Sequence, residues 1–261
     1  MNKLLYMLII SAICWSCSNS ETEKYQSNRN KVVNVHDKLV EFNKEEVMIG
    51  SMPHFSMIGD YLIISDYKAY DKIIHLFDKK SFSYVTGIAE RGQGPGEIAD
   101  IAHIAVDELN RAFYVTDYGK QSIFAYPLDS VLTNPSYIPK VKAKLDKNFV
   151  PHTYQYINDT LSIGIILEPP VGNYGFKQYV GKWNMTTGEI TPMKYEHPDI
   201  YRKRIVFDAS IKEGIYVECY IYQNLMTICD LNGELKYNIY GSNWDGNGRT
   251  RRIHHYGLVK I

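Results

Sequence analysis

Three histidines recur at a regular spacing that could place them around one metal ion. His54, His103 and His152 are separated by steps of 49 residues. Imidazole nitrogen is a good ligand for Zn²⁺, and oxygen ligands from neighbouring segments would suit Ca²⁺. The alternative is that each histidine is a polar residue hydrogen-bonded where a strand begins. The sequence predicts no other cofactor, so a metal site depends on these rings meeting at one mouth of a channel.

Motifs of known catalytic sites are missing. The chain has no H-E-x-x-H, no G-x-S-x-G and no pair of C-x-x-C motifs. A metal site assembled from single residues on several repeats would leave no local motif, so an enzyme remains the alternative hypothesis. Residues 195–200, "YEHPDI", bring Glu196, His197 and Asp199 together, but Pro198 predicts an extended turn there.

A glycine-rich segment, "IAERGQGPGEI" at residues 88–98, has the composition of a phosphate-binding loop but not its spacing. A phosphate loop needs G-x-x-x-x-G-K-[ST], or G-x-G-x-x-G opening onto a helix, whereas this segment leads into an apolar strand. We therefore expect a crossing between two sheets. Its residues would be structural, with glycines for unusual dihedral angles and proline for stiffness: Gly92, Gly94, Pro95, Gly96 and Glu97.

The elements that carry these residues repeat about every fifty residues. Each repeat is an apolar strand, a short polar break, a second apolar strand and a turn, centred on Ile64, Val115, Ile163 and Val217 at steps of 51, 48 and 54. The runs are about five to seven residues long, β-branched and aromatic, which favours strands over helices. A sandwich has no reason to repeat in this way, whereas a β-propeller of four-stranded blades does.

One repeat shows the order of strands within a blade. We expect an inner strand at residues 103–106, a second strand at 112–117 and a third at 122–126, with the outermost strand least defined. The residue pattern of this repeat resembles that of blades in the NHL and TolB-like propellers.

The N-terminus has the features of an export signal. Asn2 and Lys3 precede an apolar run, residues 4–13, that is too short to span a bilayer as a folded helix. Cys17 and the polar stretch after it resemble the lipobox and tether of bacterial lipoproteins, although Cys14 stands where leucine is usual. We expect a signal peptide and lipidated Cys17 at 1–17, a flexible tether at 18–30 and an incomplete propeller domain at 31–261. An ordinary cleavage site and a soluble periplasmic protein are the alternative.

Two further cysteines, Cys219 and Cys229, lie on either side of a predicted hairpin that turns near Gln223 and Asn224. Direct cross-strand disulfides are geometrically awkward, so we expect two reduced, buried cysteines that pack as small apolar groups, with a disulfide between them as the alternative.

The chain as a whole resembles the TolB-like, six-bladed β-propeller lipoproteins of Gram-negative gut anaerobes. The segments that carry the resemblance are "GQGPGEI", "FYVTDYGKQSIFAY", "YQYINDTLSIGII" and "MKYEHPDI". It implies an all-β ring exported to the cell envelope, with outer-membrane anchoring, and it implies no activity. Residues 53–261 hold about four blades, so we expect an open, incomplete arc and a truncated reading frame; closure of four blades on themselves is the alternative.

Two features could bind a ligand. Tyr67 and Tyr118 follow an aspartate in matching turns, where they could present a rim to a sugar or peptide or simply pack on the next blade. The segment around residues 169–176 widens a turn that other repeats keep short, and insertions of this kind often carry recognition. Its candidate residues are Pro169, Pro170, Asn173, Tyr174 and Phe176.

Charge excludes one class of partner. Lys+Arg and Asp+Glu both total 29, so there is no global field for nucleic acid, and the basic clusters at 202–204 and 249–252 are typical of solvated turns. The leading hypothesis is a lipid-anchored, non-enzymatic propeller that binds an envelope protein, peptide or glycan, on the periplasmic or the outer surface. A metal-dependent hydrolase or lactonase-like enzyme is the second hypothesis, and a non-functional truncated copy is the third.

Overall fold

The structure, a computed structural model, describes residues 21–26, 32–39, 47–69, 71–146, 150–169, 176–200 and 203–246. The predicted signal peptide and Cys17 lie outside these ranges. None of the helices within them has the length and apolar content needed to span a bilayer.

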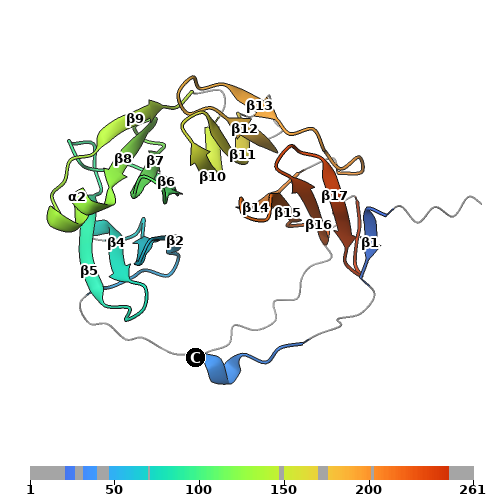
Figure 1. Cartoon of the computed structure of the whole chain (residues 1–261), viewed down its shortest axis with the longest axis horizontal. Coiled ribbons are helices and arrows are strands. Elements are labelled where there is room, and N and C mark those ends of the chain that lie inside the picture. Colours follow the sequence, from blue (N-terminus) through green and yellow to red (C-terminus); the bar gives the residue numbers. More distant parts are fainter. Residues whose placement is uncertain are drawn as a thin grey trace, which may run out of the picture.

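The described residues form four antiparallel sheets arranged as an open arc (Figure 1). Blade one contains β2 (His54–Ile58), β3 (Tyr61–Ser65), β4 (Lys72–Asp78) and β5 (Tyr84–Glu90). Blade two contains β6 (Ile101–Asp107), β7 (Ala112–Asp117), β8 (Ser122–Pro127) and β9 (Lys140–Lys144). Blade three contains β10 (Val150–Asn158), β11 (Leu161–Glu168), β12 (Lys177–Trp183) and β13 (Ile190–Pro192). Blade four contains β14 (Ile205–Ser210), β15 (Ile215–Tyr220), β16 (Leu225–Asp230) and β17 (Leu235–Tyr240).

This architecture confirms the predicted all-β propeller of about four blades. Each of the four repeat centres lies in the second strand of its sheet, and the second strand of blade two has the predicted bounds, 112–117. The four sheets lie side by side around one centre, with β2, β6, β10 and β14 innermost, and the ring is not closed between blades one and four (Figure 1).

The hydrophobic core is divided into three clusters, one at each junction between neighbouring blades. Ile63, Leu76 and Phe113 belong to the cluster between blades one and two, and Tyr154 and Trp183 to the one between blades two and three. The third cluster joins blades three and four. Because each sheet contributes side chains to its neighbours, burial of apolar surface fixes the angle between successive blades.

Within the described ranges, two short helices accompany the strands. The first, η1, is a 3-10 helix (His36–Lys38) ahead of blade one. The second, α2 (Leu128–Thr133), follows β8 and places Leu128 and Val131 in the core between blades one and two.

A fifth strand is added to blade four by the N-terminal segment. Strand β1 (Glu23–Tyr25) pairs in parallel with β17, with Glu23 opposite Asn238 and Tyr25 opposite Tyr240. These residues fall within the range 18–30 that the sequence assigns to a flexible tether, and in the structure they form a strand of the blade-four sheet.

The glycine-rich segment is the expected crossing, from the outer strand β5 to the inner strand β6. Glu97 folds back so that its carboxylate accepts a hydrogen bond from the Gly94 amide at 2.6 Å. A Cβ at Gly92 would lie 2.0 Å from the same carboxylate, and Gly96 has a φ of +80°. The Lys120 ammonium donates to the carbonyls of Gly94 and Glu97, at 2.8 and 2.7 Å. Glycine is thus needed for close approach at one position and for backbone conformation at another.

In blades one and two, an aspartate at the end of the second strand holds the segment that leads into the inner strand. Asp117, fully buried, accepts hydrogen bonds from the amides of Ala99 and Asp100 at 2.9 and 3.0 Å. Asp66 does the same for the Gly50 amide in blade one, at 2.6 Å. The matching aspartates are therefore structural.

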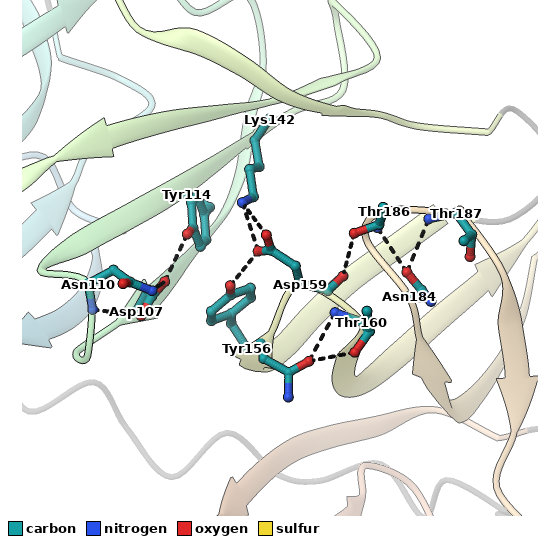
Figure 2. Close-up of polar contacts among 11 residues, drawn as sticks. Asp107, Asn110, Tyr114, Lys142, Tyr156, Asp159, Thr160, Asn184, Thr186 and Thr187 are labelled. Carbon is teal, nitrogen blue, oxygen red and sulfur yellow. Dashed lines mark hydrogen bonds and ion pairs between the residues drawn. The ribbon is translucent and has the colours of Figure 1, made fainter.

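A group of polar contacts, here called the polar clasp, includes the β6–β7 turn of blade two and the β10–β11 turn of blade three, and one ion pair in it joins the two blades (Figure 2). The Lys142 ammonium on β9 lies 2.7 Å from the Asp159 carboxylate of blade three, which also accepts a hydrogen bond from the Tyr156 hydroxyl at 2.6 Å. Since half of the Asp159 side chain is exposed, the pair contributes modestly to stability. It nevertheless fixes how the two blades meet.

Cys219 and Cys229 are both free, but only Cys229 is buried as expected. Cys219 is exposed, which corrects the prediction that both thiols pack in the interior. The register explains why they are not bonded. Cys219 is opposite Met226, whereas Cys229 is opposite Tyr216, so the two thiols project from opposite faces of the sheet.

Candidate functional site: a cleft between blades two and three

A cavity of about 230 Å³ lies at the junction of blades two and three, beside the β7–β8 turn and the β11–β12 loop. Its position is opposite the polar clasp of Figure 2, because β7 and β11 each run from the clasp to the cleft. The lining residues are Tyr118, Gln121, Leu145, Asp146, Val150, Leu167, Glu168, Pro169 and Phe176.

The Tyr118 side chain forms the wall from blade two. Its hydroxyl lies 2.9 Å from Nδ1 of His152 and 3.4 Å from the Pro151 carbonyl. Burial raises the pKa of Tyr118, with a smaller contribution from Tyr154, so the phenol is neutral. Because these two contacts with blade three hold the hydroxyl, the Tyr118 ring is fixed in place at the edge of the cleft.

The Phe176 ring forms the wall from the β11–β12 loop. The guanidinium carbon of Arg204 lies 4.2 Å from the centre of this ring, and Nη2 of Arg204 donates to the Phe176 carbonyl at 2.9 Å. Arg204 immediately precedes β14, so blade four holds the end of the loop that borders the cleft. An aromatic ring with one face covered by a cation is less free to rotate away.

The cleft has apolar walls and a few polar groups. Leu145, Val150 and Leu167 join the two aromatic rings, while Asp146 and Glu168 bring carboxylates and Gln121 an amide. Its volume is below the roughly 300–1,000 Å³ of sites for drug-sized ligands. It therefore suits one side chain or one sugar ring rather than a whole cofactor.

The structure brings together some of the predicted ligand-binding residues and not others. Tyr118, Pro169 and Phe176 line the same cleft although they come from two blades. Pro170, Asn173 and Tyr174 lie outside the described residues. Tyr67 is not part of the cleft.

Tyr67 instead lines a smaller cavity of about 150 Å³ at the junction of blades one and two, together with Arg91, Ile98 and Asp100. The two tyrosines occupy equivalent turns of successive blades. The crossing segment buries Ile98 completely at the first junction, which leaves less space there than at the second.

Sequence reasoning missed the apolar walls of the cleft. Leu145 follows β9 and Val150 begins β10, and the Leu145 amide donates to the Gln121 carbonyl at 3.0 Å. Apolar residues at strand ends are common in any propeller. Only the short connection between β9 and β10 indicates that Leu145 and Val150 line the same cleft.

The three regularly spaced histidines lie on adjacent inner strands, and two of them have hydrogen-bond partners. A ring nitrogen of His103 lies 2.8 Å from the Tyr154 carbonyl, and His152 contacts the Tyr118 hydroxyl. Burial, with a smaller contribution from the neighbouring His152 and His54, lowers the pKa of His103 to about 4. Among the residues that the structure describes, no three His, Cys, Asp or Glu side chains are grouped to hold a metal ion. The hydrogen-bonded role thus describes His103 and His152 better.

A larger cavity of about 520 Å³ opens on the central side of the arc, along the innermost strands of Figure 1. It includes His103, Glu108 and Asp208, together with exposed Phe55 and Met57. His103 and Glu108 belong to blade two and Asp208 to blade four, so the acidic and imidazole groups of this cavity come from two blades of the described part of the chain.

Among the comparisons with known proteins, a family model that matches part of the chain agrees with this fold. No curated protein matches the chain. A protein of Bacteroides fragilis, described as a candidate exported protein, is 14% identical over 85% of this chain and 60% of its own, with a TM-score of 0.48. A member of the DUF4221 family from Bacteroides vulgatus is 15% identical over 72% of this chain and 57% of its own, with a TM-score of 0.49. The chain thus spans about 60% of the length of these two structures.

Residues 40–158 match the family model DUF5128, described as a 6-bladed beta-propeller.

Proposed function

We propose that this protein is a non-enzymatic binding module of the bacterial cell envelope, and that the cleft between blades two and three receives its ligand. The observation that carries the proposal is the meeting of Tyr118, Pro169 and Phe176 at one apolar cleft. The first follows a structural aspartate and the other two come from the loop that interrupts the repeat.

Anchoring to the envelope is part of the proposal. It is supported by the apolar N-terminal run, by Cys17 in a lipobox-like setting and by the resemblance to TolB-like lipoproteins. We expect a diacylated cysteine at position 17 on an outer-membrane protein.

The proposed ligand is a peptide or glycan of an envelope component that inserts one group into the cleft. Aromatic walls stack on the apolar face of a sugar or on an apolar side chain. The carboxylates of Asp146 and Glu168 would favour ligands that present hydroxyl or ammonium donors, and disfavour anions.

Glycan and peptide arrays test this function. The mature protein is applied in parallel with Tyr118→Ala, Phe176→Ala and Tyr222→Ala. Tyr222 is a control because it is half exposed, at 52%, and lies on the β15–β16 turn of blade four, away from the cleft.

We expect bound spots whose signal falls at least tenfold for the two cleft variants and is unchanged for Tyr222→Ala. Arrays without any bound spot, or spots that bind all four proteins equally, would contradict the proposal. Circular dichroism of each variant separates lost binding from lost folding.

A further inference from the structure

The N-terminal strand is tightly attached to one edge of the propeller. The Asn238 amide donates to the Thr22 carbonyl at 2.8 Å, and the Gln26 amide donates to the Tyr240 carbonyl at 2.8 Å. The Glu23 carboxylate accepts a further hydrogen bond from the Asn238 side chain at 3.1 Å. These contacts fix the chain to β17 from residue 22 onward.

Side-chain packing holds the same strand. The Tyr25 ring stacks on the Tyr240 ring, with centroids 4.6 Å apart and planes inclined by 16°. The Lys24 ammonium lies 5.6 Å from the centre of the Tyr237 ring. Strand β1 is therefore held by backbone pairing and by side chains on both of its faces.

The distance from the proposed anchor to this edge is short. Only residues 18–21 separate Cys17 from Thr22. A fully extended chain covers at most about 3.6 Å per residue, so Thr22 lies within about 18 Å of the lipidated cysteine. A flexible tether of residues 18–30 would have allowed more than twice this distance and no fixed orientation.

We propose that the outer edge of blade four, formed by β1 and β17, is the surface that faces the lipid bilayer. The inference rests on the proposed lipidation of Cys17. It adds an orientation, because attachment at β1 leaves blade four nearest the membrane.

The exposed residues of this edge suit a membrane interface. Tyr25 and Tyr237 are 72% and 44% exposed, and tyrosine is favoured where one end of a side chain meets lipid and the other meets water. Lys24 and Lys236 are exposed beside them, and their aliphatic stems can lie along the interface.

The acidic residues nearby decide what kind of membrane fits. Glu21 and Glu234 are also exposed, and Glu234 is paired with Lys194. With Lys194 included, three lysines and two glutamates at this edge leave little net charge. We therefore expect contact with a neutral phospholipid surface through the tyrosines rather than attraction by anionic lipids.

This orientation also places the ligand cleft. Figure 1 shows β1 on the far side of blade four from the junction of blades two and three. Blade three separates the cleft from the edge that carries the anchor, so the cleft is held away from the bilayer and open to the aqueous phase.

Energy transfer from the protein to the membrane tests the orientation. The mature chain carrying Cys219→Ser is coupled through Cys17 to a maleimide lipid in phosphatidylcholine vesicles that contain an acceptor dye. A donor dye is attached through an azide-bearing amino acid placed at Lys236 on β17, or at Leu109 on the β6–β7 turn of blade two. Leu109 is 92% exposed, so labelling there disturbs no packing.

We expect transfer from position 236 to exceed transfer from position 109 by severalfold. A flexible Gly/Ser insertion of about 20 residues after Ser18 should remove most of this difference. The double substitution Tyr25→Ser and Tyr237→Ser should reduce the difference by a smaller amount. Equal transfer from both positions, or stronger transfer from 109, would overturn the orientation.

The native protein separates this proposal from the one on which it rests. Mass spectrometry of the N-terminal peptide from the native envelope reports whether Cys17 carries lipid. An unmodified Cys17 contradicts the anchoring itself, whereas a lipidated Cys17 with weak transfer from position 236 contradicts the orientation alone.

Discussion

The guanidinium carbon of Arg204 lies 4.2 Å from the centre of the Phe176 ring, and the same side chain donates to the Phe176 carbonyl. A residue at the start of blade four thereby holds a wall of the cleft between blades two and three. The cleft is thus supported by three successive blades, and its geometry depends on their packing.

Replacing Arg204 should weaken ligand binding while the fold persists. Arg204→Lys keeps the charge but loses the planar stack and the forked donor. We expect affinity for an array-selected ligand to fall about five- to tenfold, equivalent to roughly 1–1.4 kcal/mol, measured by isothermal titration. Arg111→Lys is the control, because the Arg111–Asp129 pair is exposed and remote from the cleft; similar losses in both variants would refute this role for Arg204.

The crossing segment should show coupling between Gly92 and Glu97. Gly92→Ala places a methyl group against the Glu97 carboxylate and should break its hydrogen bond to Gly94. We expect the free energy of unfolding to fall by about 1–3 kcal/mol, measured by urea denaturation. In a Glu97→Ala background the same change should cost little. Additive effects would mean that the two residues do not share one packing site.

His103 should make the protein less stable in acid. Burial, the main cause, and its histidine neighbours hold its pKa at about 4 in the folded state, below the value of about 6.5 expected in an unfolded chain. As the pH falls from about 6.5 to 4, the unfolded state takes up a proton that the folded state excludes, and stability is lost. The loss due to His103 is about 3 kcal/mol.

Urea denaturation at pH 7 and pH 4.5 measures this dependence. We expect His103→Gln to show a smaller loss of stability between the two pH values than the parent protein. Equal losses in both proteins would show that the His103 imidazole takes up a proton in the folded state as readily as in the unfolded chain.

The two free cysteines should differ in reactivity. Cys219 is exposed, but partial burial of its thiol raises its pKa. N-ethylmaleimide should therefore modify Cys219 slowly in the folded protein. Burial raises the pKa of Cys229 to about 11, so this thiol should react only after unfolding. Peptide mass mapping with and without urea distinguishes the two; equal labelling in the folded protein would contradict the sheet register.

The strands of the propeller could be predicted from sequence because each is an alternating or apolar run that ends at a turn residue. Residues 112–117 illustrate this. Asp117 ends the strand, and its carboxylate accepts a hydrogen bond from the Ala99 amide. Helix α2 could not be predicted, since six residues are too few to show helical periodicity. It forms because Leu128 and Val131 bury against the junction of blades one and two.

The cleft could be predicted only in part. Tyr118 and the residues at 169 and 176 stand out in sequence as a turn tyrosine and as an insertion, but nothing local indicates that they meet. Tyr67 has the same sequence context as Tyr118 but a different spatial environment, because Ile98 of the crossing segment fills the junction beside Tyr67. Contacts across blade junctions depend on the connections between blades, which vary from repeat to repeat.

A crystal structure of the protein with an array-selected ligand tests the central claim most directly. We predict electron density for one sugar ring or side chain between Tyr118 and Phe176, beside Leu167. Density in the central cavity near His103 and Asp208, with an empty cleft, would contradict the account.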